Sequence, residues 1–247
     1  MSRVTFENYG TAARAGLDEI LLSRGYIVQR EPERLVLPDV AAKLALRPSD
    51  ELLEIGCGPG RLLIPMSFLV RRAVGIDHPD VIARLRALFP SPDLETIDGN
   101  FLDYRPKAGE AYDKILVYSV VSSLADAEEA FGFVEKAMGL LKPGGRLLVG
   151  DIANVDRKRR FLATRYGQEF DRRWKEQQRA AGAVPAEVER DRLWQPDASA
   201  FDPNDAFVCE LLRRARLRGF DAYCLPQSPE LPYGQTREDV LICRLPE

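Results

Sequence analysis

Short apolar runs alternate with longer amphipathic segments from residue 51 onward. The runs predict strands, and the segments with apolar residues three and four positions apart predict helices. We expect strands at Glu51–Ile55, Ala73–Asp77, Leu94–Ile97, Lys114–Tyr118, Arg146–Asp151, Gly219–Leu225 and Val240–Arg244. We expect helices at Arg61–Arg71, Pro79–Phe89, Ala127–Leu141 and Asn204–Arg218. This alternation predicts an α/β fold, a doubly wound, seven-stranded and mostly parallel sheet with a hairpin around Pro226–Gly234.

Two segments do not belong to that alternation. Residues 1–47 contain an amphipathic stretch, Ala12–Arg24, and a short helix near Asp39–Leu46, and we interpret them as an N-terminal helical cap. Residues 154–203 form a helical insertion after the fifth strand. Within the domain of residues 48–247, this insertion would overhang the carboxyl edge of the sheet and act as a lid over a substrate.

The sharpest local pattern follows the first predicted strand. An apolar run containing Glu54 ends in three glycines at alternate positions, Gly56, Gly58 and Gly60, and then Arg61. Glycines permit a turn that side chains cannot enter, and the carboxyl end of a strand is where open α/β sheets bind ligands. A dinucleotide site needs G-x-G-x-x-G, so this spacing disfavours a nicotinamide dehydrogenase.

Composition narrows the class further. The chain has 247 residues, of which 45% are hydrophobic and 30% charged, with a formal charge of −3, so nothing draws it strongly toward nucleic acid or membranes. No apolar stretch reaches the roughly 18 residues of a membrane span, and the first ten residues do not look like a signal peptide. We therefore expect a cytoplasmic protein whose four cysteines are free thiols. With His78 as its single histidine, we expect no metal site.

The stretch Leu52–Gly60 resembles the first motif of class I S-adenosylmethionine (SAM)-dependent methyltransferases. The run Leu140–Leu147, with Lys-Pro-Gly-Gly at its centre, is also similar to that family. The resemblance implies SAM as cofactor, S-adenosylhomocysteine (SAH) as product and a sheet that ends in an antiparallel strand. It places Glu54 at the methionine ammonium, and it brings the backbone of Gly56, Cys57, Gly58 and Gly60 close to the amino-acid end.

The resemblance also assigns the nucleoside. Asp77 closes the second strand and would bind both ribose hydroxyls, although an aspartate before Pro79 also suits a helix N-cap. Asn100 stands where the family commonly has an acid that accepts from the adenine amino group, and Asp98 is the alternative. The N–H of Phe101 would donate to an adenine ring nitrogen. His78 would contribute at the edge of the adenosine rather than to catalysis.

Candidates for catalysis lie at strand ends and in the cap. Asp151, at the end of the fifth strand, is the first candidate base or acceptor anchor, followed by Asn154; a capping acid is the alternative. The fourth strand ends at Tyr118, which by resemblance faces the reacting methyl and also contacts the cofactor. Tyr9 would fold over the cofactor from the cap, or simply pack in the core. Trp174 and Trp194 could stack on an acceptor or hold the insertion in place.

The acceptor is less defined. Neither an Asn/Asp-Pro-Pro-aromatic sequence nor a Pro-Cys nucleophile is present, which favours transfer to oxygen or nitrogen of a small molecule. The segment Val149–Phe161 resembles methyltransferases of bacterial polysaccharide gene clusters, which implies a sugar, with the basic run Arg157–Arg160 binding nucleotide phosphates. A protein or RNA methyltransferase and a non-catalytic SAM-binding partner subunit remain alternatives. The oligomeric state, monomer or homodimer, stays open.

Overall fold

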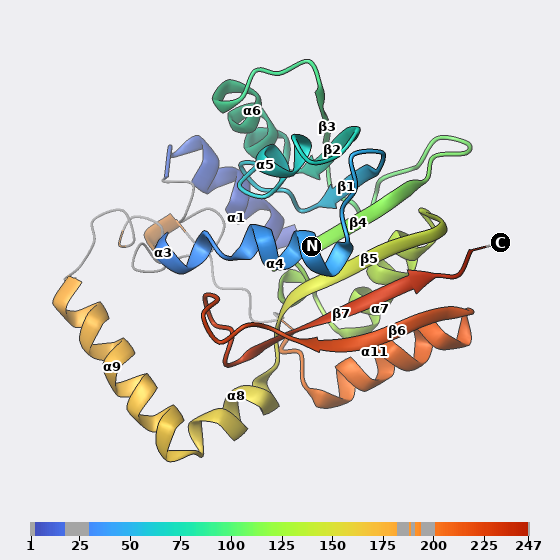
Figure 1. Ribbon diagram of the computed structural model, residues 1–247. Coiled ribbons are helices and arrows are strands. Elements are labelled where there is room, and N and C mark those ends of the chain that lie inside the picture. The colour runs from blue at the N-terminus through green and yellow to red at the C-terminus, as the bar shows by residue number, and fades with distance from the viewer. Residues whose placement is uncertain (1–2, 18–29, 182–187, 189–190, 194–200, 247) are drawn as a thin grey trace.

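The computed structural model describes residues 3–17, 30–181, 188, 191–193 and 201–246, with a seven-stranded sheet at its centre (Figure 1). Across the sheet the order is β3-β2-β1-β4-β5-β7-β6, which confirms the predicted doubly wound α/β fold. The strands are β1 (Glu51–Ile55), β2 (Arg72–Asp77), β3 (Leu94–Asp98), β4 (Tyr112–Tyr118), β5 (Leu141–Ala153), β6 (Phe220–Pro226) and β7 (Arg237–Arg244).

The first five strands pair in parallel, whereas β7 runs antiparallel to both of its neighbours, β5 and β6. The predicted hairpin and the antiparallel final strand are therefore confirmed. The final strand lies inside the sheet, between β5 and β6, and β6 forms the edge.

Helices cover both faces of the sheet. On one face, α7 (Ala127–Met138) and α11 (Asp205–Leu217) pack against alternate strand residues such as Leu53, Ile115 and Leu147. On the other face, α4 (Val36–Leu44) and α5 (Leu63–Ser67) cover the strand residues that alternate with these. On that face, α6 (Pro79–Leu88) covers the outer strands. Because both faces are buried, the central strands need apolar residues at successive positions, as the sequence pattern indicated.

The N-terminal helices differ from the prediction. α1 (Arg3–Arg14) packs on α6 through Ala12, Ala13 and Val81, and Gly16 follows it with a φ of +72°. The predicted stretch Ala12–Arg24 was thus wrong in its start, and positions 18–24 lie outside the described residues. After α3 (Arg30–Glu33), α4 begins three positions before the predicted helix and ends where Ala45 adopts a left-handed conformation.

Two predicted helices are too long. Residues Arg61–Arg71 give only the five-residue α5, because the glycine turn continues through Leu62 and the chain must already enter β2 at Arg72. α7 ends at Met138, before the predicted Leu141. The Lys142–Gly145 segment lies in β5 at an irregularity in its pairing with β4, where the backbone of Gly144 has a φ of +74°.

The insertion after β5 consists, in its described part, mainly of α8 (Val155–Leu162) and α9 (Arg165–Ala181), and α9 extends away from the sheet (Figure 1). Trp174 of α9 contacts the ring of Tyr233 in the β6–β7 connection, with ring centroids 6.4 Å apart. Trp194 lies outside the described residues.

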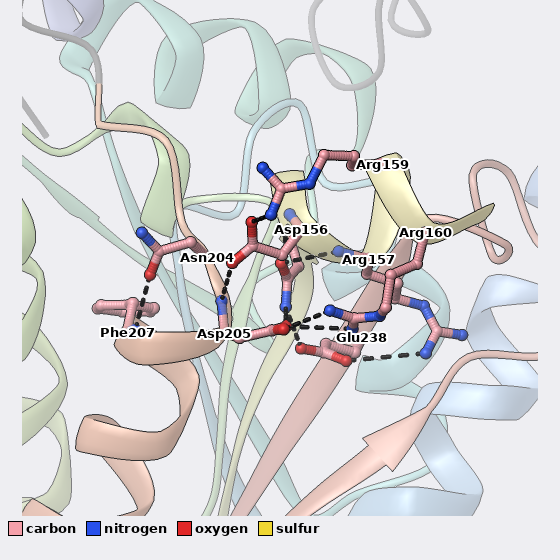
Figure 2. Close-up of polar contacts among 9 residues, drawn as sticks. Asp156, Arg157, Arg159, Arg160, Asn204, Asp205, Phe207 and Glu238 are labelled. Atoms are coloured by element: carbon pink, nitrogen blue, oxygen red, sulfur yellow. Dashed lines mark hydrogen bonds and ion pairs between the residues drawn. The ribbon is translucent and has the colours of Figure 1, made fainter. Parts of the chain in front are cut away.

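Both ends of the insertion are fixed at one point, shown in Figure 2. Asn154 caps α8 by accepting from the N–H groups of Asp156 and Arg157, and its amide donates to Asp205 and Glu238. Asp156 in turn accepts from the N–H of Asp205 at the start of α11. These contacts give Asn154 a structural role at the base of the insertion.

All four cysteines are free thiols, as predicted. In the described part of the chain, no helix is both long and apolar enough to cross a membrane. Within the same ranges, no group of three or more histidine, cysteine, aspartate or glutamate side chains is placed to hold a metal ion.

Candidate functional site

The glycine turn after β1 has the geometry that its sequence predicted. Gly56, Gly58 and Gly60 all have positive φ, at +77°, +55° and +88°. A Cβ on Gly56 would lie 2.4 Å from the side chain of Val120, whereas a Cβ on Gly58 would meet nothing within 4 Å. Gly56 is therefore needed for close packing against the loop after β4, while Gly58 leaves open space.

The N–H groups of this turn are bonded within the protein. Those of Gly56 and Cys57 donate to the carbonyl of Ile76 in β2, and that of Gly60 donates to the carbonyl of Cys57. The N–H of Gly58 donates to Asp77 at 2.7 Å. The turn thus offers a ligand close approach to its backbone, while these four N–H groups are already bonded within the protein.

The Cys57 side chain faces the core. It packs with Leu63 and Ile82 beneath the turn, and a Cβ on Gly75 would lie 2.8 Å from its sulfur. Burial raises the pKa of this thiol well above its ordinary value. Cys57 therefore serves the site by packing and through its backbone.

Glu54 points from β1 into the site without a partner for one of its oxygens. The side chain is 3% exposed, and its Oε2 has no hydrogen-bond partner among the described residues. Burial, and secondarily the nearby charge of Asp77, raises the pKa of Glu54 well above its ordinary value. A buried carboxylate oxygen without a partner is rare in folded proteins and marks a place for a cationic or hydrogen-bond-donating ligand.

Asp77, at the end of β2, is buried beside the turn. Its two oxygens accept from the N–H groups of Gly58 and His78, at 2.7 and 2.6 Å. Burial raises the pKa of Asp77, and these two hydrogen bonds oppose the shift. Since each carboxylate oxygen has a second lone pair, Asp77 fixes the turn and still has capacity for hydroxyl donors.

His78 is engaged with the helices around it. Its Nδ1 accepts from the N–H of Asp80 at the start of α6, and its ring lies 4.7 Å from that of Phe6. A Cβ on Gly10 of α1 would collide with the imidazole. His78 thus seats α1 on α6, and it is not among the residues lining the two cavities described next.

A cavity of about 610 Å³, open to solvent, lies over these groups. Glu54, Asp77 and the glycine turn form one wall, the end of β4 forms another, and α1 and α3 contribute from above. The lining residues are Tyr9, Glu33, Glu54, Gly56, Cys57, Gly58, Arg61, Leu62, Asp77, Tyr118, Ser119, Val120 and Ser123. The structure therefore brings the predicted Tyr9 and Tyr118 to one cavity with five of the predicted cofactor residues, whereas Gly60 and His78 do not line it.

A smaller cavity, whose volume of about 220 Å³ includes space open to solvent, shares Gly56, Asp77 and Val120 with the first. It is otherwise lined by Phe6, Ile55, Ile76, Gly99, Asn100, Phe101 and Phe133. The Asn100 Oδ1 accepts from the N–H of Leu102 at 3.1 Å. The N–H of Phe101 has no partner among the hydrogen bonds of the described residues.

The ends of β4 and β5 bring Tyr118, Ser119 and Asp151 together. Ser119 and Asp151 both adopt left-handed backbone conformations, with φ of +61° and +60°, and the Ser119 hydroxyl donates to Asp151 Oδ2. Non-glycine residues in that region store strain and cluster at functional sites. Asp151 is 2% exposed and does not line the large cavity, but Ser119, which does, connects it to that space.

Polar side chains around Asp151 hold it in place through hydrogen bonds. Asp239 accepts from the N–H of Asp151 at 2.8 Å and from the ammonium of Lys43 at 2.7 Å. Arg237 lies 3.4 Å from Asp151 Oδ2 and donates to its carbonyl. Gln227 bonds to Asp239 and lies 3.4 Å from the Tyr118 hydroxyl.

Sequence reasoning missed Ser119, Arg61, Glu33 and Phe6 as lining residues. Ser119 and Arg61 flank predicted motifs, so their positions next to strand ends were the available signal. Glu33, which contacts Arg61 at 3.2 Å, and Phe6 reach the site only through tertiary packing of α3 and α1.

The basic run on α8 is largely paired. Arg159 contacts Asp156 at 2.7 Å, Arg160 contacts Asp205, and Arg157 lies 3.7 Å from Glu238 (Figure 2). These acids anchor the insertion to α11 and β7. The run was predicted to bind phosphates, and three of its four cations already have acidic partners.

Known proteins place the chain in a family. Residues 26–206 match the family model described as a methyltransferase domain, and the chain belongs to that family. The predicted family is confirmed.

Curated relatives match about half of the chain. The ubiquinone biosynthesis O-methyltransferase of Chelativorans sp. is 35% identical over 134 residues, covering 50% of this chain and 47% of that protein. The protein of the same name from Mesorhizobium japonicum is 34% identical over 144 residues, covering 53% and 52%. The chain therefore spans about half the length of these relatives.

Solved structures share the fold over nearly the whole chain. The N-methyltransferase NodS of Bradyrhizobium japonicum, in complex with SAH, has a TM-score of 0.60 at 16% identity, covering 99% of this chain and all of that one. Magnesium protoporphyrin IX methyltransferase from Synechocystis, with bound SAH, has a TM-score of 0.59 at 15% identity, covering 96% and 94%.

Proposed function

We propose that this protein transfers a methyl group from SAM to a hydroxyl oxygen of a small molecule. The observation that carries the proposal is the buried Glu54 oxygen, which has no protein partner and lies in the wall of a cavity beside an open glycine turn. An ammonium group fits that position, because it would satisfy and neutralise the carboxylate there.

The residues present fit the rest of SAM. Asp77 has lone pairs for the ribose hydroxyls. The open space at Gly58 admits the part of the ligand that lies against the backbone of the turn. Asn100 and Phe101 would bind the adenine edge, the latter through its unpaired N–H. Arg61, a cation in the cavity wall, suits the methionine carboxylate. Tyr118 and the turn residues Gly56, Cys57 and Gly60 would pack around the ligand, and His78 would support its edge indirectly.

The acceptor side would be formed by Ser119, Asp151, Tyr9 and Tyr118. When bound, SAM supplies an electrophilic methyl carbon. The protein would align the acceptor oxygen with that carbon. Ser119 would accept the proton of the acceptor hydroxyl and donate its own hydroxyl proton to Asp151. The hydrogen bond from Ser119 to Asp151 gives the path for this transfer. Tyr9 and Tyr118 would close the site from α1 and from β4, excluding water.

A hydroxyl acceptor has the best support. A hydroxyl needs to lose a proton, and the site contains a serine linked to a buried carboxylate. The relatives named above are O-methyltransferases, and this chain matches them over about half of their length. The lid role of the insertion, residues 154–203, stays a prediction from the sequence, since none of its described residues lines either cavity. A sugar acceptor stays a prediction. Phosphate binding by the basic run has less support, because three of its four cations already have acidic partners.

Two measurements test this function in sequence. Calorimetry should detect binding of SAM and SAH, and Glu54→Ala should abolish it at micromolar ligand. SAH release should then be screened against hydroxylated acceptors of different kinds, including ortho-diphenols and nucleotide sugars, with RNA as a comparison. Failure of the wild-type protein to bind either ligand would overturn the proposal. Binding without turnover on any acceptor would favour the non-catalytic partner subunit.

A further inference from the structure

Lys136, on α7, contacts the turn that follows β3. Its ammonium donates to the carbonyl oxygen of Phe101 and to that of Leu102, the latter at 2.9 Å. It also lies 4.8 Å from the centroid of the Phe101 ring. This lysine does not line either cavity, and the function proposed above makes no use of it.

Four N–H groups of this turn, those of Gly99, Leu102, Asp103 and Tyr104, are hydrogen-bonded. The Asn100 carbonyl accepts from the N–H groups of Asp103 and Tyr104, at 3.0 and 3.1 Å, and the Asn100 side chain accepts from that of Leu102. The N–H of Phe101 remains without a partner, in a residue that is 3% exposed and lines the smaller cavity. Buried backbone N–H groups are almost always paired, so a ligand acceptor is expected there.

Two anchors set the direction of that N–H. On the strand side, the N–H of Gly99 donates to the carbonyl of Asp77 at 2.9 Å, which ties the turn to β2. On the helix side, Lys136 holds the carbonyls of Phe101 and Leu102. Phe133, one helical turn before Lys136, packs edge-on against the Phe101 ring at 5.0 Å. α7 thus restrains both the backbone and the ring of Phe101.

The charge environment of Lys136 agrees with a positioning role. No ion pair joins it to an acid among the described residues. Burial, with a contribution from the nearby Arg105, lowers the pKa of Lys136, and Asp103 opposes the shift. Desolvating a partly buried ammonium costs free energy. Here two charge-assisted hydrogen bonds to carbonyls of one turn offset that cost, and the same two bonds hold the turn in place.

We propose that Lys136 is a positioning residue for adenine recognition: it holds the turn so that the Phe101 N–H donates to a ring nitrogen of the SAM adenine. The proposal rests on the proposed function, because it presumes that the nucleoside occupies the smaller cavity.

The test is a binding cycle read by calorimetry, without turnover. The ligands are SAH and two analogues in which adenine nitrogen 1 or nitrogen 7 is replaced by CH. The proteins are wild type, Lys136→Met, Lys136→Arg and the control Lys175→Met, which removes an exposed lysine of α9. Wild type should bind one of the two analogues about tenfold more weakly than SAH, because one hydrogen bond is lost.

Lys136→Met should bind SAH about tenfold more weakly than wild type does. It should bind that analogue as well as it binds SAH, so that the discrimination disappears. Lys136→Arg should retain both the affinity and the discrimination, and Lys175→Met should match wild type. Thermal melting of each variant checks that it is folded.

Three results would overturn the inference. Lys136→Met could bind SAH within twofold of wild type, or it could bind SAH weakly yet keep the full penalty for the analogue, which would make its role purely structural. Alternatively, wild type could bind SAH but show no penalty for either analogue; then the adenine assignment fails while SAM binding stands. If wild type binds no SAH, the proposed function fails as well.

Discussion

The cofactor side of the site and the base of the insertion differ in how far their charged groups are paired. Beside the glycine turn, Glu54 Oε2 and the Phe101 N–H are buried with no partner in the described structure. At the base of the insertion, the arginines of the basic run lie against Asp156, Asp205 and Glu238 (Figure 2), and only the Nε of Arg157 is buried there without a hydrogen-bond partner in the described structure. A buried group without a partner marks a place for a ligand where it also lies beside an open cavity, as Glu54 does, whereas groups that satisfy one another hold the fold together.

This contrast reverses the impression that the sequence gives. Four consecutive basic residues are conspicuous in a sequence, whereas a single glutamate inside an apolar run is not. Conspicuous charge is a weak guide to function because acids from distant segments can neutralise it. The acids that do so here come from α8, α11 and β7. Four predictions bear on the comparison.

The largest expected effect is at Asp151. Asp151→Asn keeps the size of the side chain and tolerates the left-handed backbone but cannot accept the proton. We expect kcat to fall by about 10²-fold or more, with SAH affinity within about twofold of wild type. Steady-state kinetics with an acceptor found by the screen, together with calorimetry, measure the two effects. Near-normal kcat would remove Asp151 from the proton path.

Glu54→Gln should weaken SAH binding by about 10- to 100-fold, since a charge-assisted hydrogen bond is replaced by a neutral one. Calorimetry checks this loss. The same change should stabilise the ligand-free protein. Affinity close to that of wild type would show that the buried carboxylate is not the ammonium site.

The stabilisation should depend on pH with a definite sign. The pKa of Glu54 is raised in the folded protein, so the native state holds this proton more tightly than the unfolded chain. Its contribution to stability therefore falls as pH rises from the ordinary carboxyl pKa, about 4.3, through the raised folded value. Glutamine does not titrate. Glu54→Gln should thus melt above wild type at pH 8, and the difference should shrink toward pH 4.

Gly58→Ala and Gly144→Ala form a matched pair. Both glycines have positive φ, +55° and +74°, and neither would have an atom within 4 Å of an added Cβ. Each substitution should cost about 1 kcal/mol of stability through backbone strain. Only Gly58→Ala should also weaken SAH binding, by severalfold, because its methyl group would enter the cavity. Equal SAH affinity in the two variants would argue that the ligand does not approach Gly58.

The smallest effects should come from the basic run. Arg160→Ala breaks an exposed ion pair with Asp205 and should cost less than about 1 kcal/mol, measured by thermal or denaturant unfolding. The double variant Lys158→Ala and Arg159→Ala should change the KM for a hydroxylated acceptor by less than about twofold, since surface substitutions of this kind have little effect. A large increase in KM restricted to phosphorylated acceptors would restore the phosphate-binding hypothesis.

Much of the fold followed from local pattern. Strands such as β1 were predicted to the residue because a buried parallel strand needs an unbroken apolar run, and that run ends in glycine. The limits of α5 and α7 were wrong, because turn residues on both sides of α5 shorten it and because β5 begins at Leu141, the last residue of the longer helix that was predicted. Helix ends are decided by such competition, which a single segment does not reveal.

The candidate site divides in the same way. The positions of Glu54, the three glycines and Asp77 could be predicted, since the carboxyl ends of adjacent parallel strands must meet at one edge of a sheet. The binding state of these groups could not. That the turn's amides bond to β2, or that Lys136 holds the turn after β3, depends on distances between segments far apart in the chain.

The amino-acid order alone thus determined the alternation of strands and helices, the glycine turn and the edge of the sheet that carries polar side chains. Tertiary structure decided which of those side chains found partners: Arg160 met Asp205, Ser119 met Asp151, and Glu54 Oε2 met no group of the described chain. The physical reason is range. Periodicity and turn preference act over a few residues, whereas burial and charge pairing depend on what the rest of the chain brings within a few ångströms.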